Sequence, residues 1–289
     1  MDIATVRFEE QRAYLFGIAY RMLGRVMEAE DILQDAYLRF RHALSAGTIQ
    51  SDRAYLSAIV TRLCMDYLKS AVVQREEYIG PWLPEPLPTA DMPEGLSSQS
   101  ESLSMAFLVV LERLSPLERA VFLLHEVFDY DYAEIAPWLD KSESACRQIF
   151  SRAKRRIVDQ RPRFQASPAE QAQIFSAFLA ACQVGDLAGL KALLVPQASA
   201  WSDGGGKVSA ATRPLYGAET VARFVLGIFQ QAVPDLSYAF TVMNGSVSLV
   251  VRQASGQVEV VVVPEIIEAK VHSLRFIRNP DKLRHLRNS

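Results

Sequence analysis

The side chains most often used for metal binding and nucleophilic chemistry are few and scattered in this sequence. Its three cysteines, Cys64, Cys146 and Cys182, stand far apart without paired spacing, and there are only four histidines. Zinc sites and disulfide frameworks are built from closely spaced sets of such residues. We therefore expect no metal site, no disulfide and no cofactor, and we expect the three thiols to be small core residues.

The densest cluster of functional side chains lies between Asp131 and Val158. Polar and cationic residues recur there at helical spacing, namely Arg147, Gln148, Ser151, Arg152 and Arg155. Such side chains hydrogen-bond base edges in the major groove of DNA, which admits one helix, while further cations neutralise phosphates. The chemistry indicated is recognition of double-stranded DNA.

Two helices joined by a tight turn are expected to position this cluster. Apolar residues at helical spacing predict a first helix over 132–139, Asp140 and Lys141 supply the turn, and Ser142 is a good N-cap for the second helix. The pattern is typical of a helix-turn-helix, although Pro137 must kink the first helix or remove a hydrogen bond. The alternative is a helical hairpin with a solvated basic face.

The whole chain sets bounds on these interpretations. Its 289 residues suffice for two or three domains, and 49 % apolar with 22 % charged residues is an ordinary globular composition. The net charge of −2 means that any DNA contact must be local. The N-terminus carries no signal-peptide pattern and no apolar run reaches membrane-spanning length, so we expect a cytoplasmic protein.

Three helices are predicted at the N-terminus. The first ends or bends at Gly24, the second spans Val26–His42, and the third runs from Asp52 to about Arg75. The outer side of the second helix carries exposed polar residues, among them Asp31, Gln34 and Asp35. A solvated acidic face is the plainest interpretation of such a pattern.

Two separated motifs resemble one known family. The stretches YRMLGRVMEAEDILQDAYLRF and RAYLSAIVTRLCMDYLKS are similar to the second conserved region of sigma-70 factors, in particular the extracytoplasmic-function group. LERLSPLERAVFLLHEVFDYDYAEIA, followed by the predicted helix-turn-helix, resembles the fourth region of the same group. The resemblance implies two all-α domains that bind core RNA polymerase and promoter DNA.

The resemblance also assigns roles to residues. Asp31, Gln34 and Asp35 would dock on core polymerase. Tyr55, Arg62 and Lys69 on the third helix would capture melted promoter DNA, since aromatic and cationic side chains can repay part of the cost of strand separation. Tyr55 is equally well explained as a core residue. The basic second helix of the helix-turn-helix would read double-stranded promoter DNA.

A proline-rich stretch, residues 74–100, separates the two motifs. Its prolines favour extended, semi-stiff chain, and an aromatic segment within it looks like a docking element: Trp82, Leu83, Pro84, Glu85 and Pro86. This WLPEP segment also resembles the linker signature of sigma factors that carry a C-terminal extension. The alternative is an ordinary linker with one stray aromatic residue.

The C-terminal part has a different pattern. A helix is predicted over 168–195, followed by strands with hairpin signals at Asn244-Gly245 and Ser255-Gly256, and one helix over 217–231. Ile266–Ile277 is expected to be a single strand. Helices followed by a curled antiparallel sheet make an α+β cone, which resembles SnoaL-like domains.

Two short motifs in this part resemble signatures of the same sigma subgroup. One is a glycine loop, Asp203, Gly204, Gly205, Gly206 and Lys207, and the other is a polar turn, Asn279, Pro280, Asp281, Lys282 and Leu283. The glycine loop lacks the Gly-Lys-Ser/Thr run of a phosphate-binding loop, and an ordinary corner loop is the plain alternative. We interpret both motifs, with WLPEP, as an interdomain regulatory contact.

The predicted organisation is therefore a region 2 domain (1–75), a proline-rich linker (76–100), a region 4 helix-turn-helix domain (101–164) and a SnoaL-like α+β domain (168–289). The predicted function is that of a sigma factor, not an enzyme, regulated in cis by its C-terminal domain in place of a separate anti-sigma protein, and monomeric. The alternative is a DNA-binding regulator with a ligand-sensing or enzymatic cone, for which the available acid and base groups are Asp203, Lys207, Asp235 and His272.

Overall fold

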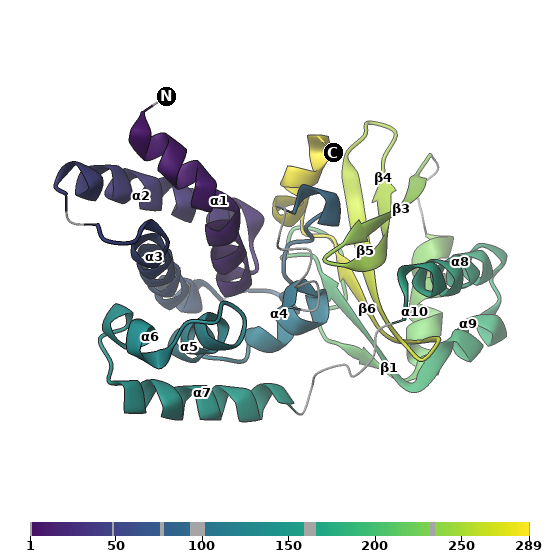
Figure 1. Ribbon diagram of the computed structural model, residues 1–289. Coiled ribbons are helices and arrows are strands. Elements are labelled where there is room, and N and C mark those ends of the chain that lie inside the picture. The colour runs from purple at the N-terminus through teal and green to yellow at the C-terminus, as the bar shows by residue number, and fades with distance from the viewer. Residues whose placement is uncertain are drawn as a thin grey trace. The chain divides into compact units, whose positions relative to one another are not determined.

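The structure is a computed structural model, shown in Figure 1, and it describes residues 2–47, 49–75, 78–92, 102–158, 166–231 and 235–288. The chain forms two compact units. The helical unit comprises Met1–Glu77 and Asp91–Arg161, and the α+β unit comprises Tyr78–Ala90 and Pro162–Ser289. The part of the predicted linker from Tyr78 to Ala90 thus belongs to the same unit as the C-terminal domain.

The helical unit begins with the three expected helices, α1 (Ile3–Leu23), α2 (Val26–Ser45) and α3 (Asp52–Arg75). Gly24 ends α1 with a left-handed φ of 65°, a conformation that glycine adopts without steric cost. The facing sides of these helices are buried, so that Leu15, Leu33 and Leu56 are at most 1 % exposed.

Four further helices follow in this unit: α4 (Met105–Leu111), α5 (Pro116–Glu126), α6 (Tyr132–Trp138) and α7 (Glu143–Val158). Reciprocal side-chain to backbone hydrogen bonds cap α5 at Ser115 and α6 at Asp131. Asp140 adopts the left-handed conformation expected of the turn (φ 51°), and the Ser142 hydroxyl accepts a hydrogen bond from Ala145 N at 3.2 Å. The predicted helix-turn-helix backbone is therefore confirmed.

Buried polar contacts tie the first three helices to the last four. The buried guanidinium of Arg119 on α5 donates to the Met22 carbonyl on α1 and forms an ion pair with Glu112 at 2.7 Å. The hydroxyls of Ser57 and Tyr130 lie 2.9 Å apart. Regions that resemble two separate sigma regions thus pack together within one unit.

The α+β unit contains α8 (Pro168–Val184), α9 (Leu187–Leu193) and α10 (Ala218–Gln230) beside a curled six-stranded sheet (Figure 1). The strands are β1 (Leu194–Asp203), β2 (Leu215–Tyr216), β3 (Ser237–Met243), β4 (Ser246–Arg252), β5 (Val258–Ile267) and β6 (Lys270–Ile277), in the order β2-β1-β6-β5-β4-β3. Apolar side chains of the helices and of the inner strands form its core, for example Phe178, Val221 and Leu274. This arrangement confirms the predicted fold class of helical domains followed by an α+β domain.

Several details of the α+β unit differ from the sequence-based predictions. The sheet is mixed, because β1 and β6 pair in parallel while the other neighbours are antiparallel. The helix predicted over 168–195 is two helices, since Gly185 ends α8 with a φ of 73°. The strand predicted over Ile266–Ile277 is broken by a turn at Glu268 and Ala269, which both have positive φ without the glycine or asparagine that signals such turns.

The C-terminal motif also differs from its prediction. Pro280–Asn288 forms a 3-10 helix where a polar turn was predicted, and the motif that begins at Asn279 is mostly buried. A second, short 3-10 helix spans Thr89–Asp91.

Among the residues that the structure describes, no helix is long and apolar enough to cross a membrane. The same residues contain no cluster of three or more histidine, cysteine, aspartate or glutamate side chains able to hold a metal ion. The three cysteines are buried free thiols.

Candidate functional sites

The predicted DNA-reading residues lie together on one solvent-exposed face of α7. All five are exposed: Arg147, Gln148, Ser151, Arg152 and Arg155. On the opposite face Cys146, Ala153 and Ile157 are buried, whereas Ala145 and Ile149 are only partly buried. The face is thus available for groove contact.

Local interactions hold the first of these side chains. Arg147 forms an ion pair with Glu143 at 3.4 Å, and its guanidinium lies 5.7 Å from the ring centroid of Tyr132 on α6. Arg155 Nε donates to the Ser151 carbonyl at 3.4 Å. Within the described part of the chain, nothing holds the side chains of Gln148 and Arg152, which leaves their donors available to an external partner.

The predicted polymerase-binding residues form a stripe on α2. Asp31, Gln34 and Asp35 are exposed, and two apolar side chains extend the same stripe, Met27 at 48 % exposure and Leu38 at 53 %. These two side chains add exposed apolar area beside the acidic groups, which a partner could bury. These two residues were not identified from the sequence, because apolar residues of an amphipathic helix are normally assigned to the core.

The three candidates on α3 follow one stripe, but their surroundings differ. Tyr55 is half-buried, packs against Phe40 and lines a groove of about 500 Å³ together with Leu38, His42 and Ile59. Lys69 is exposed and forms an ion pair with Asp66 at 3.0 Å. Tyr55 is therefore both a packing residue and accessible from the groove.

Arg62, the third candidate, is already engaged within the helical unit. Its Nε donates to the Trp138 carbonyl at 2.7 Å and its Nη2 donates to the Pro137 carbonyl at 3.1 Å. Both carbonyls lie at the C-terminal end of α6, where helix carbonyls lack intrahelical partners. In this conformation the Arg62 guanidinium caps α6, and a DNA contact would require its release.

A second site lies in the α+β unit, where the parallel pairing of β1 and β6 brings two motifs together. Asp203 at the end of β1 pairs with Ile277 at the end of β6. Because parallel strands end at the same edge of a sheet, the glycine loop after Asp203 and the motif from Asn279 emerge side by side. The Asp203 carbonyl accepts hydrogen bonds from the backbone N–H groups of Arg278 and Asn279, both at 2.8 Å.

The WLPEP segment crosses this edge as extended chain. Residues 83–88 are buried, with Leu83 0 % and Glu85 3 % exposed. Leu83 N donates to Asp203 Oδ2 at 2.8 Å, and the Tyr78 hydroxyl donates to Asp203 Oδ1. The Asp203 carboxylate therefore accepts hydrogen bonds from Leu83 within the segment and from Tyr78, which precedes it.

Lys282, in the C-terminal motif, binds the same Asp203 carboxylate. Its ammonium contacts Asp203 Oδ2 at 2.7 Å and donates to the Leu83 carbonyl. It also lies 4.0 Å from the ring centroid of Trp82 and 5.3 Å from that of Tyr78, which are cation–π distances. Lys282 and Asp203 are 2 % and 0 % exposed, so this is a buried ion pair with hydrogen-bonding partners on both sides.

Close packing explains the glycines of the loop. A Cβ atom on Gly205 would lie 2.2 Å from Asn279 Nδ2, and one on Gly204 would lie 2.5 Å from the Val208 carbonyl oxygen. Asn279 in turn donates to the Tyr78 hydroxyl at 3.0 Å. The loop is therefore a packing surface for the other two segments.

The remaining members of the motifs lie at the edges of the site. Lys207 and Asp281 form an exposed ion pair, Gly206 faces Ile79, and Leu283 is 2 % exposed. The structure thus brings the three predicted interdomain segments into one contact. Pro280, Pro84 and Pro86 contribute fixed backbone, and Pro84 and Pro86 are buried.

Other residues of this contact were missed by the sequence analysis. Leu87 N donates to Asn244 Oδ1 and Asn244 N donates to the Leu87 carbonyl, both at 2.9 Å, and His285 Nε2 lies 2.7 Å from the Pro86 carbonyl oxygen. Asn244 was identified as a hairpin residue, and its φ of 52° agrees with that role. Nothing in the sequence indicated that its side chain also binds the linker.

The four acid and base groups considered for catalysis do not form a catalytic arrangement. Asp203 is bound to Lys282, Lys207 pairs with Asp281, Asp235 lies in an exposed turn, and His272 lies on β6. Within the described residues no hydrogen bond or ion pair joins any two of the four.

Comparison with known proteins yields two family-model matches, Sigma-70 region 2 over residues 8–72 and Sigma-70, region 4 over residues 104–157. The chain is 36 % identical over 288 residues to the ECF RNA polymerase sigma factor SigJ of Mycobacterium tuberculosis, covering 95 % of this chain and 91 % of that one. It is also 36 % identical over 198 residues to the probable ECF RNA polymerase sigma factor SigI of the same species, covering 68 % of each chain. The crystal structure of SigJ matches with a TM-score of 0.76 at 33 % identity, over 96 % of this chain and 97 % of that one.

Proposed function

Because this chain belongs to the family of extracytoplasmic-function RNA polymerase sigma factors, we propose that it binds core polymerase through α2, reads promoter DNA through α7 and is regulated in cis by its α+β unit. The observation that carries the regulatory part is the buried Asp203–Lys282 pair, which holds the WLPEP segment. In this proposal the α+β unit does the work of a separate anti-sigma protein.

Core polymerase binding is assigned to the α2 stripe. The acidic groups of Asp31 and Asp35 supply charge for steering and specificity, and Met27 and Leu38 supply apolar area to bury. Changing both aspartates to lysine is expected to weaken binding of the full chain to core polymerase at least about tenfold. The matched control changes Glu9 and Glu10 to lysine, which alters the charge equally on exposed positions of α1.

DNA reading is assigned to the exposed face of α7. Replacing Arg152 and Arg155 by alanine removes two cations. Where both also neutralise phosphates, the slope of log affinity against log salt is expected to fall by about 2, since each phosphate contact contributes about 0.9. Arg113→Ala removes an exposed cation outside α7 and should leave the slope unchanged. Equal slopes for all three proteins would remove α7 from the DNA interface.

Capture of melted DNA is assigned to the α3 stripe. The groove beside Tyr55 offers an aromatic edge and the neighbouring His42 to an unstacked base. Arg62 becomes available only when its hydrogen bonds to the end of α6 are broken, so DNA binding and separation of the two helical parts are coupled in this proposal. Arg62→Ala should therefore loosen the helical unit as well as weaken promoter opening.

The regulatory contact acts through the linker that joins the two DNA-binding parts. Residues 78–90 lie in the sequence between α3 and α4, so docking them on the α+β unit shortens the chain that connects the two DNA-binding parts. Undocking would lengthen this connection and change the promoter spacings that the two parts can reach at once. Variants that release the segment should consequently change transcription without touching DNA.

A further inference from the structure

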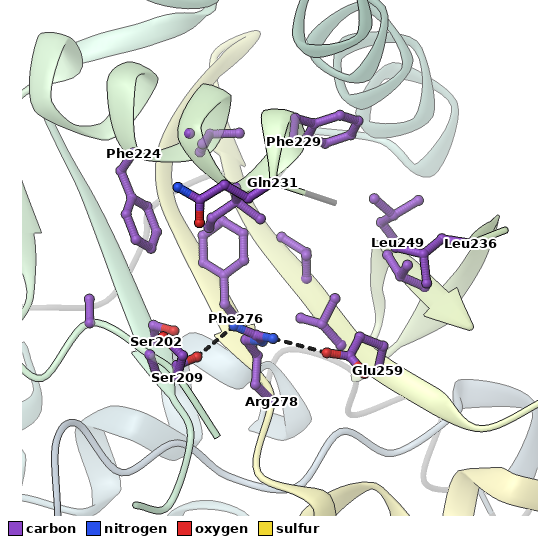
Figure 2. Close-up of a pocket in the computed structure, with 18 of the residues that line it drawn as sticks. Ser202, Ser209, Phe224, Phe229, Gln231, Leu236, Leu249, Glu259, Phe276 and Arg278 are labelled. Atoms are coloured by element: carbon purple, nitrogen blue, oxygen red, sulfur yellow. Dashed lines mark hydrogen bonds and ion pairs between the residues drawn. The ribbon is translucent and has the colours of Figure 1, made fainter. Parts of the chain in front are cut away.

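A cavity of about 530 Å³ lies between α10 and the sheet of the α+β unit (Figure 2). Its volume falls within the range of about 300–1,000 Å³ that is usual for small-molecule sites. Most of its wall is apolar and aromatic, as in Phe224, Ile228, Phe229, Leu249 and Phe276. Phe224 and Phe276 meet edge to face, with ring centroids 5.7 Å apart, and form an aromatic corner of the wall against which an aromatic body can pack.

One end of the cavity is polar. Arg278 forms an ion pair with Glu259 at 2.9 Å and donates to the Ser209 carbonyl, as the dashed lines in Figure 2 mark. Ser202, at the same end, is 3 % exposed, and its hydroxyl makes no hydrogen bond to any described residue. Because Ser202 lines the cavity, this hydroxyl can donate a hydrogen bond to an acceptor atom of a ligand there.

The polar end is continuous with the linker contact. Ser202 immediately precedes Asp203, and Arg278 immediately precedes Asn279, the two residues that hold Tyr78 and Leu83. Their backbones are joined by the 2.8 Å hydrogen bonds to the Asp203 carbonyl. A molecule that moves Ser202 or Arg278 must therefore move the groups that hold the WLPEP segment.

We propose that this cavity is a regulatory site for a small molecule with a flat aromatic or polycyclic body and one acidic or carbonyl oxygen end, which accepts hydrogen bonds from Ser202 and Arg278. Its occupation changes how firmly residues 78–90 are docked. The binding stands independently of the proposed sigma-factor function, whereas the consequence for transcription rests on it.

Binding is tested with 8-anilinonaphthalene-1-sulfonate, a fluorescent aromatic anion, titrated into the full-length protein. Gly227 lines the cavity, and a Cβ there meets nothing within 4 Å, so Gly227→Leu fills the site and Gly227→Ala fills it slightly. We expect affinity to fall about tenfold or more for the leucine variant and less for the alanine variant. Gln230→Leu, exposed on the same helix and outside the cavity, should bind like the wild type.

The polar end is tested with a matched probe, N-phenyl-1-naphthylamine, which lacks the sulfonate. Ser202→Ala is expected to weaken binding of the sulfonate probe about fivefold and to leave binding of the uncharged probe unchanged. Equal losses for both probes would overturn the assigned orientation. No binding to the wild type, or equal binding to the wild type and Gly227→Leu, would overturn the site itself.

Coupling is measured by hydrogen exchange of the peptide that contains Leu83 and Leu87, whose amides are held by Asp203 and Asn244. Saturating sulfonate probe is expected to change this exchange by at least about threefold in the wild type and not in Gly227→Leu. Binding without any change in this peptide would refute the regulatory coupling. A wrong sigma-factor assignment would be seen separately: the wild-type protein would bind the sulfonate probe but would not bind core polymerase.

Discussion

Replacing Lys282 by methionine tests the buried linker contact directly. Methionine keeps an unbranched apolar stem but removes the ammonium that contacts Asp203 and the Leu83 carbonyl. The Asp203 carboxylate would then remain buried with only the neutral donors Leu83 N, Gly205 N and the Tyr78 hydroxyl. A buried charge that loses its opposite charge is strongly destabilising.

The expected size of the effect follows from this burial. Removal of one partner of a buried ion pair costs about 3–5 kcal/mol, and each 1.4 kcal/mol is a factor of about ten in an equilibrium constant. The equilibrium constant for undocking residues 78–90 from the α+β unit should therefore rise by a factor on the order of hundreds to thousands. Lys207→Met is the matched control, because its ion pair with Asp281 is 53 % and 38 % exposed and such pairs contribute about 1 kcal/mol or less.

Urea unfolding and hydrogen exchange of residues 78–90 provide the assay. Lys282→Met should lower the stability of the α+β unit and speed exchange in this segment, whereas Lys207→Met should change neither appreciably. Adding Asp203→Asn to Lys282→Met should restore part of the lost stability, because it removes the stranded charge. The reasoning is refuted if Lys282→Met and Lys207→Met behave alike, or if the second change only adds to the loss.

Three further predictions concern the packing inside each of the two units, taken separately. Gly205 and Gly256 both have a positive φ, +60° and +82°, but a Cβ on Gly205 would lie 2.2 Å from Asn279 Nδ2, whereas one on Gly256 would meet open space. Gly256→Ala should therefore lower the free energy of unfolding in urea by about 1–2 kcal/mol, and Gly205→Ala should lower it by more. Arg119→Met should lower the stability of the helical unit by about 3 kcal/mol, because it removes the ion pair with Glu112 and the hydrogen bond to the Met22 carbonyl, and a thermal melt would measure this. Burial raises the pKa of the Cys182 thiol to about 12, so dithionitrobenzoate should label it at pH 8 only after unfolding; rapid labelling of the native protein would contradict its burial.

The helices and the reading face could be predicted from the sequence because their signals are local. Apolar spacing and a capping residue such as Ser142 act within a few positions along the chain. The same holds for the Asn244-Gly245 turn and for the exposed side of α7.

The geometry of the linker contact could not be predicted, because it depends on strand pairing. Asp203 and Lys282 are far apart in the sequence and meet only because β1 and β6 run in parallel. Hydrophobic alternation identifies strands but not their neighbours or direction, so the pattern fits a wholly antiparallel sheet as well as the mixed sheet that the structure has. The turn at Glu268 and Ala269 was missed for a local reason, since neither residue is a usual turn residue.

Promoter-specific run-off transcription with core polymerase tests the central claim most directly. The full-length wild type, Lys282→Met and Lys207→Met are compared on the same promoter DNA. We predict a promoter-specific transcript from the wild type, at least about a fivefold change in its amount for Lys282→Met, and no change for Lys207→Met. Absence of both a transcript and a complex with core polymerase would contradict the sigma-factor function, and equal transcription from all three proteins would contradict regulation by the α+β unit.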